Sequence, residues 1–97
     1  MFRLSVENLS NEEQKAYWMP KIRNLDLFGC YAQTELGHGS NVAGIETTAT
    51  LDPATDEFVI HTPTLTATKY WPGDLGHFSS HAVVFARLLI GEEDHGV

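Results

Sequence analysis

The chain has 97 residues, of which 42% are apolar and 20% charged, and this composition is typical of one small globular domain. Six basic and 13 acidic residues give a net charge of −7, which argues against nucleic acid and anionic membrane surfaces as partners. Cys30 is the only cysteine and cannot form an internal disulfide, which fits a reducing compartment. No apolar run approaches the length of about 20 residues that spans a membrane. Neither a secretory signal nor a C-terminal peroxisomal tripeptide is recognised in the sequence.

The first predicted element is a helix. Ser10 followed by Glu13 has the spacing of a capping box, which predicts a helix start near Asn11. Pro20 is expected to stop or bend this helix, because proline lacks the amide hydrogen that a helix interior needs.

Five strands are predicted after the helix, over residues 27–34, 45–51, 58–62, 65–71 and 81–90. Period-two alternation and the turn chemistry around Pro53 predict a hairpin over 45–62. The apolar run 81–90 favours a strand buried on both faces. One helix and five strands without helical crossovers predict a mainly β protein, an antiparallel β-sandwich or open barrel. A polar turn follows the last strand, so we expect the sequence to be truncated.

Two glycine-containing loops, 34–41 and 69–76, follow predicted strands and are expected to build one pocket. Glycine permits close backbone approach to a ligand because it has no side chain. The first loop fits neither a phosphate-binding P-loop, nor the dinucleotide-binding fingerprint, nor a hydrolase nucleophile elbow. From the pattern alone it is equally well an ordinary turn.

The other candidate residues each have two interpretations. His77 and His81 have the spacing of metal ligands on a helix, but the region is predicted as loop and strand, which favours exposed or hydrogen-bonded histidines. Glu35 has the chemistry of a general base, yet a carboxylate there more often pairs with Lys, Arg or a backbone amide. Tyr70 and Trp71 are either core aromatics or a wall for a flat ligand.

Four segments of the chain resemble the peroxisomal acyl-CoA oxidases, which belong to the acyl-CoA dehydrogenase superfamily of flavoproteins. The segments are Tyr31-Ala32-Gln33-Thr34-Glu35-Leu36-Gly37-His38-Gly39-Ser40-Asn41, Glu46-Thr47-Thr48-Ala49-Thr50, Tyr70-Trp71-Pro72-Gly73 and His81-Ala82-Val83-Val84. The resemblance covers nearly the whole chain. It implies that residues 1–25 end a helical domain, and that residues 26–97 form an incomplete middle β-domain.

The resemblance also implies that the pocket binds FAD. Thr34 is the best supported contact, because a threonine of the family's first loop meets the flavin ring. The implied cofactor-binding residues are Tyr31, Gln33, Thr34, Gly39, Ser40, Tyr70, Trp71, Pro72 and Gly73. Ser40 is also expected near the thioester of an acyl-CoA substrate. No catalytic residue and no metal ligand is assigned within the chain.

Some positions separate the branches of the superfamily. Leu36, Asn41 and the segment 70–73 differ from the usual dehydrogenase pattern and favour the oxidase branch. Tyr70 and His77 stand where the oxidases more often have tryptophan and lysine, and Asp74 where they more often have glycine.

The implied function is part of fatty acid β-oxidation in the peroxisome, in an enzyme whose family is homodimeric. Such an oxidase converts an acyl-CoA to a trans-2-enoyl-CoA and reduces dioxygen to hydrogen peroxide. The family's catalytic glutamate lies in a C-terminal helical domain, so the chain is expected to be inactive alone. Two alternatives stay open at this stage: a non-catalytic flavin- or partner-binding module, and a fragment of an acyl-CoA dehydrogenase.

Overall fold

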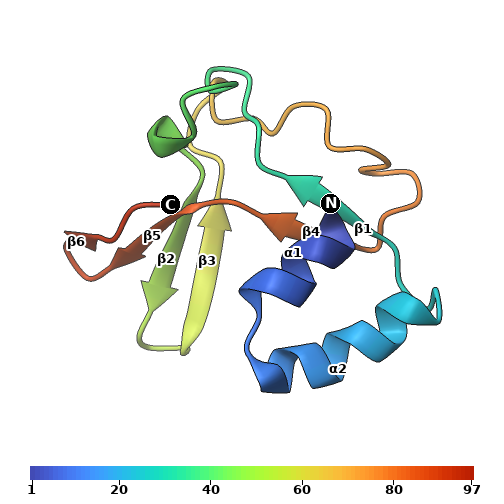
Figure 1. The fold of residues 1–97 in the computed structure, drawn as a ribbon. Coiled ribbons are helices and arrows are strands. Elements are labelled where there is room, and N and C mark those ends of the chain that lie inside the picture. Colours follow the sequence, from blue (N-terminus) through green and yellow to red (C-terminus); the bar gives the residue numbers. More distant parts are fainter. The chain divides into compact units, whose positions relative to one another are not determined.

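The computed structural model describes residues Met1–Val97 and contains two α-helices, one 3-10 helix and six strands (Figure 1). The chain divides into two compact units, and each is described by itself. Unit 1 comprises Met1–Ala32 and Trp71–Val84, and unit 2 comprises Gln33–Tyr70 and Phe85–Val97. The predicted division into residues 1–25 and 26–97 stays a prediction. None of the helices has the length and apolarity needed to span a membrane.

Unit 1 packs two helices, α1 (Phe2–Leu9) and α2 (Glu12–Arg23), with a two-stranded parallel sheet of β1 (Gly29–Ala32) and β4 (His81–Val84). The ring of Phe2 lies directly against Gly29 and occupies the space that a side chain at position 29 would need. The core of this unit is a cluster of apolar residues from the helices and the segment that follows them: Val6, Met19, Ile22 and Leu27, with Phe2, Trp18 and Val83 packed against it.

Helix α2 begins where it was predicted, but through a different pair of residues. The side chain of Asn11 accepts a hydrogen bond from the Gln14 amide at 2.8 Å, and the Gln14 side chain accepts one from the Asn11 amide at 3.0 Å. This capping box lies one residue after the predicted Ser10 and Glu13. Pro20 does not end the helix, which continues to Arg23. Burial of Ile22 and basic residues in the last turn stabilise this end.

We expect Asn11→Ala to lower the free energy of unfolding by about 1 kcal/mol, the usual cost of losing an N-cap. Ser10→Ala is the matched control and is expected to change it by less than about 0.5 kcal/mol, since Ser10 does not cap α2. Urea denaturation followed by tryptophan fluorescence measures both, because both tryptophans, Trp18 and Trp71, lie in unit 1. Equal losses in the two variants would contradict this cap assignment.

Unit 2 contains the 3-10 helix η1 (Val42–Gly44) and a four-stranded sheet. The strands are β2 (Thr48–Asp52), β3 (Glu57–His61), β5 (Arg87–Ile90) and β6 (Glu93–Asp94), in the order β3-β2-β5-β6 (Figure 1). The β2–β3 hairpin confirms the predicted one. In its turn the Asp52 carboxylate accepts the Ala54 amide hydrogen at 2.9 Å, and Asp56 adopts a left-handed conformation. Strand β3 is an edge strand whose residues are all exposed.

The antiparallel sandwich or barrel of five strands is not confirmed. The structure has six strands in two sheets, neither of which closes: β1 and β4 form a parallel sheet, and the four-stranded sheet is mixed because β2 pairs with β5 in parallel. The predicted strand 81–90 is instead two strands, β4 and β5, which belong to different sheets. Its residues are exposed or half-buried, so the prediction of burial on both faces is wrong.

The predicted strand 65–71 is also absent. The hydroxyl of Thr64 accepts the Ala67 amide hydrogen at 3.1 Å, and the Thr68 amide donates to the Leu65 carbonyl at 3.1 Å. Local bonds of this kind turn the backbone and compete with an extended strand. The alternating threonines of this segment therefore do not indicate a sheet face.

Candidate functional site

The first glycine loop is a tight turn in unit 2, closed by reciprocal backbone hydrogen bonds between Glu35 and His38. The turn pairs with residues 66–70, which lead into the second loop. Three amide groups donate across this pairing, each with an N···O distance of 2.9 Å: Leu36 to Thr68, Gly37 to Thr66 and Tyr70 to Thr34. The backbone on both sides of Glu35 is therefore held in place.

Glu35 is the centre of this arrangement, with only 1% of its surface exposed. Its carboxylate accepts hydrogen bonds from both backbone and side-chain donors. These are the Glu46 amide at 2.9 Å, the Thr47 amide at 2.9 Å, the Thr47 hydroxyl at 2.6 Å, His38 Nδ1 at 2.8 Å and Lys69 Nζ at 3.2 Å. Such a set of donors is expected around a carboxylate that is buried in its ionised form.

The surroundings of Glu35 also decide its protonation. Burial by itself would raise the pKa of this carboxyl, but the hydrogen bonds from the Glu46 and Thr47 amides, the Thr47 hydroxyl and His38 outweigh burial and lower the pKa from 4.5 to about 2. A general base near neutral pH needs a higher proton affinity and an accessible oxygen. Glu35 therefore has a structural role, which is the second of the two interpretations of this residue.

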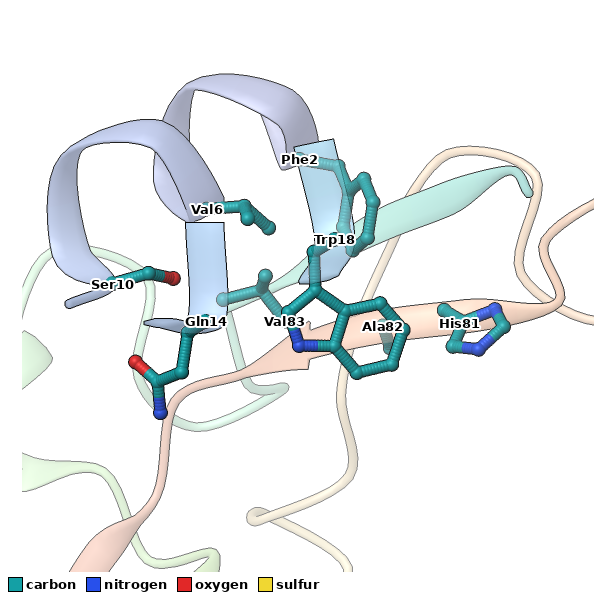
Figure 2. Close-up of a pocket in the computed structure, with 8 residues that line it drawn as sticks. All are labelled: Phe2, Val6, Ser10, Gln14, Trp18, His81, Ala82 and Val83. Carbon is teal, nitrogen blue, oxygen red and sulfur yellow. The ribbon is translucent and has the colours of Figure 1, made fainter. Parts of the chain in front are cut away.

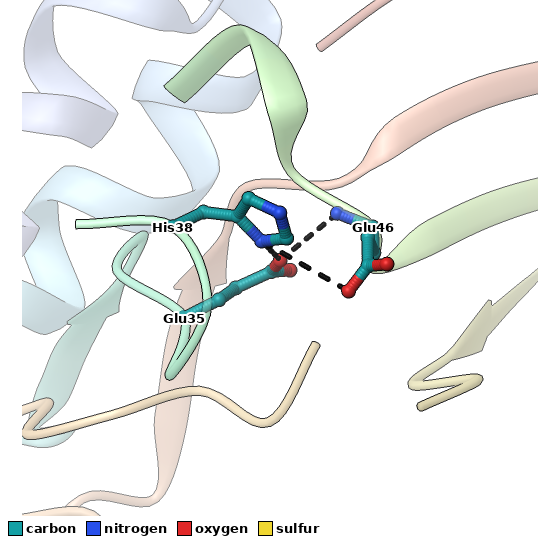
Figure 3. A group of neighbouring side chains, drawn as sticks. All are labelled: Glu35, His38 and Glu46. Carbon is teal, nitrogen blue, oxygen red and sulfur yellow. Dashed lines mark hydrogen bonds and ion pairs between the residues drawn. The ribbon is translucent and has the colours of Figure 1, made fainter. Parts of the chain in front are cut away.

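Figure 3 shows Glu35 together with His38 and Glu46. His38 Nδ1 lies 2.8 Å from one Glu35 oxygen and 4.0 Å from a Glu46 oxygen, and the three possible ligand atoms are within 4.8 Å of one another. The Glu46 carboxylate accepts hydrogen bonds from Thr66 at 2.6 Å and Thr64 at 3.0 Å, which lower its pKa. Since the Lys69 ammonium already supplies positive charge to Glu35, we assign no metal to this cluster.

Five of the predicted flavin-binding residues lie in unit 2: Gln33, Thr34, Gly39, Ser40 and Tyr70. The hydrogen bond from the Tyr70 amide to the Thr34 carbonyl places these two residues side by side. Tyr70 is 54% exposed and Thr34 is half-buried. Gly39 is exposed, and a side chain added there would meet no atom within 4 Å. This part of the predicted site is accessible, and backbone hydrogen bonds hold it.

The other four predicted residues, Tyr31, Trp71, Pro72 and Gly73, lie in unit 1. Tyr31 is on β1, opposite Val83 of β4. Trp71 is 78% exposed and has a φ angle of 52°, a left-handed conformation that is unusual for a bulky residue. Because the two units are described separately, the assignment of all nine residues to one flavin site stays a prediction.

His77 and His81 are both exposed and each has an aromatic neighbour. The His77 ring stacks on Phe78 with centroids 5.5 Å apart, and the His81 ring meets the edge of Trp18 at 5.4 Å. His81 Nδ1 also lies 2.9 Å from the Ser80 hydroxyl. Both histidines are therefore exposed, and His81 is also hydrogen-bonded, as predicted for this pair.

Unit 1 contains a cavity between its helices and β4 (Figure 2). The sequence did not indicate this cavity, because the helices and β4 are far apart in the chain and meet only in the folded unit. Its volume is about 250 Å³. Phe2, Val6, Trp18 and Val83 make its walls mainly apolar, and Gln14 is among its polar residues. Ligand sites usually have volumes of about 300–1,000 Å³, so this space is small for a cofactor.

No protein-family model matches the chain. It is 58% identical over its whole length to peroxisomal acyl-coenzyme A oxidase 1 of Arabidopsis thaliana, of which it spans 15%. Among solved structures, acyl-CoA oxidase 1 of A. thaliana matches 99% of the chain with a TM-score of 0.96 and 59% identity. The structure of Caenorhabditis elegans acyl-CoA oxidase-2 bound with FAD, ascaroside-CoA and ATP matches 97% of the chain with a TM-score of 0.93 and 47% identity.

The solved structures confirm a small α+β fold, with two helices and mixed sheets, as the fold of the corresponding part of acyl-CoA oxidases. The match extends to 15% of the A. thaliana chain and 14% of the C. elegans chain. The chain belongs to the acyl-CoA oxidases, as a fragment that spans about 15% of the length of the curated relatives it matches.

Proposed function

We propose that this chain is an FAD-binding part of an acyl-CoA oxidase and that the loop from Thr34 to Ser40 supplies its main contacts. The observation that carries the proposal is a preformed loop. The Glu35 hydrogen bonds hold its base rigidly, while Gly39 and Ser40 remain exposed at its surface. A loop that is ordered before binding loses little conformational entropy when a ligand arrives.

The residues at this loop fit the chemistry of a flavin. A flavin ring needs fixed hydrogen-bond donors and acceptors at its edge and flat or apolar neighbours at its face. Thr34 carries a hydroxyl, Tyr70 beside it carries an exposed aromatic ring, and Gly39 leaves open space for close approach. FAD, when bound, would supply the hydride acceptor of the reaction. The C. elegans relative in complex with FAD supports the choice of this cofactor.

The proposal for the whole enzyme follows from the relatives. The parent protein would desaturate a fatty acyl-CoA to a trans-2-enoyl-CoA and reduce dioxygen to hydrogen peroxide, in the peroxisome and as a homodimer. Ser40 would lie near the thioester of the substrate. Glu35, the carboxylate of the loop, is locked by its donors and cannot serve as the base. We therefore expect no hydrogen peroxide from the purified chain and an acyl-CoA, and peroxide formation would contradict this part of the proposal.

FAD titration of the purified chain, followed by flavin fluorescence, tests the cofactor proposal. We expect a saturable change, and we expect Gly39→Ala to weaken FAD binding by about tenfold or more, since the added methyl group blocks approach to the backbone. The Gly39 backbone is not left-handed and its surroundings are open, so this substitution leaves the fold intact.

Thr55→Ala is the control for this titration, because Thr55 is an exposed residue in the turn of the β2–β3 hairpin. It should bind FAD as the parent chain does. If the parent chain gives no fluorescence change at saturating FAD, the proposed cofactor role is wrong. If Gly39→Ala binds FAD with unchanged affinity, the loop backbone is not the contact.

A further inference from the structure

We propose that Glu35 is the positioning residue of the FAD loop: its buried carboxylate sets the backbone conformation in which Thr34 and Tyr70 face the cofactor. The proposal rests on the FAD role of the loop given above. Glu35 would act through the backbone, since its oxygens contact protein donors and its surface is buried. It is therefore not a catalytic residue.

The first argument is the composition of the interior of unit 2. The largest fully buried side chains are Ile45, Glu35 and Thr47, all of which belong to this unit. Ala67 is the other buried apolar residue of unit 2, and it contributes little area. Apolar packing is non-directional and is sparse here, so it cannot determine the loop conformation by itself. The directional bonds of the Glu35 carboxylate can do so.

The second argument is that one side chain joins three segments of the chain. Glu35 belongs to the loop, its oxygens accept the amide hydrogens of Glu46 and Thr47 at 2.9 Å each, and Lys69 Nζ reaches it from the segment that begins the second loop. Loss of the carboxylate would therefore break the side-chain bonds to both segments at once and leave the loop held mainly by its backbone pairing with residues 66–70.

The third argument is that the carbonyl groups on both sides of the Thr34 side chain, those of Gln33 and of Thr34 itself, accept hydrogen bonds. Lys69 Nζ donates to the Gln33 carbonyl at 3.0 Å and to the Phe85 carbonyl at 2.7 Å, in addition to Glu35. The Thr34 carbonyl accepts the Tyr70 amide hydrogen. The ion pair with Glu35 holds the ammonium where it can bind Gln33, and through this chain of contacts the charge of Glu35 orients the expected flavin contact.

Amide hydrogen exchange of the cofactor-free chain tests the proposal without FAD. In Glu35→Gln, which keeps the side-chain shape, we expect the amides of Leu36, Gly37 and Tyr70 to exchange about tenfold faster or more, because their pairing opens locally. Amides of the β2–β3 hairpin are the internal control and should accelerate by a smaller factor, because they report only the general loss of stability. Parent rates at all three loop amides would overturn the proposal.

If Glu35→Gln fails to fold, Thr47→Val allows the same exchange measurement on a folded chain. Thr47→Val removes one donor to Glu35 with little change in volume. It should accelerate exchange at the same three amides by a smaller factor than Glu35→Gln does, and accelerate the hairpin amides less than the loop amides. Uniform acceleration over unit 2 would overturn the proposal, because it would show only a general loss of stability.

A double-mutant cycle on FAD affinity distinguishes positioning from a purely structural role. We expect Thr34→Ala to weaken FAD binding by about tenfold in the parent chain and to have little further effect in the Glu35→Gln background. Leu51→Ala, in the hairpin, is the control background, where Thr34→Ala should keep its full effect. Additive losses in Glu35→Gln would overturn the proposal. If the parent chain does not bind FAD, the cofactor role is wrong, and the exchange experiment still decides whether Glu35 sets the loop.

Discussion

Glu35→Leu is expected to lower the free energy of unfolding by about 3–5 kcal/mol, the usual cost of removing one partner of a buried ion pair. The Lys69 side chain is only 11% exposed, so the variant leaves its ammonium buried without a counter-charge. The Glu46 and Thr47 amides lose their acceptor at the same time. A domain of this size typically has a total stability of about 5–15 kcal/mol, so we expect unit 2 to be strongly destabilised.

Urea denaturation followed by far-UV circular dichroism measures this effect, because unit 2 contains no tryptophan. Glu57→Leu is the matched control: it makes the same substitution at an exposed position of β3 and should cost less than about 0.5 kcal/mol. Adding Lys69→Met to Glu35→Leu should recover part of the loss, since both buried charges are then gone. Equal costs at positions 35 and 57 would show that the Glu35 network does not stabilise unit 2.

The elements that could be predicted from the sequence are those that depend on neighbours in the chain. The β2–β3 hairpin combines alternating residues with the Pro53 turn, and both signals act within a few residues. Helix α1 was missed because its N-cap residue, Met1, makes no side-chain capping hydrogen bond. The spacing of Phe2 and Val6 was its only signal, and burial against the sheet stabilises it.

Pairing between distant segments explains the other differences. The run 81–90 divides because its two halves pair with different strands, β1 and β2, far earlier in the chain. Periodicity within the run carries no information about those partners. The parallel pairing of both strands could not be anticipated for the same reason, so the topology needed the tertiary structure.

The candidate site likewise has one part that local sequence reveals and one part that depends on distant contacts. The loop itself was recognisable from Gly37 and Gly39 and from the resemblance to acyl-CoA oxidases. The structural pairing favoured for Glu35 is confirmed, but its donors could not be identified, because His38, Thr47 and Lys69 come together with it only in the folded unit. A single carboxylate followed by one lysine much later in the chain gives no spacing pattern, so the sequence favoured pairing over general-base chemistry without identifying the partners.

The pH dependence of stability provides an independent measure of the Glu35 network. The pKa of Glu35 is about 2 in the folded chain and 4.5 without the fold, so the unfolded chain binds this proton more tightly. The stabilisation is therefore fully present above the unfolded value and is lost as the pH falls from about 5 toward 2. The difference between the two pKa values corresponds to about 3 kcal/mol.

Glu35→Gln cannot titrate at this position, so its free energy of unfolding should fall less steeply over this range than that of the parent chain. Urea denaturation at a series of pH values gives both curves. Glu46 and Asp94 also have lowered pKa values, through hydrogen bonds from Thr66 and from the Gly96 amide, but both residues remain in both proteins. The difference between the curves therefore reports mainly on Glu35, with a smaller contribution from Glu46, whose pKa the Glu35 charge raises slightly. The two curves should approach each other by about 3 kcal/mol between pH 5 and pH 2. Parallel curves would mean that the carboxylate gains no stabilisation from its donors in the folded chain, which would also remove the physical basis for its control of the loop.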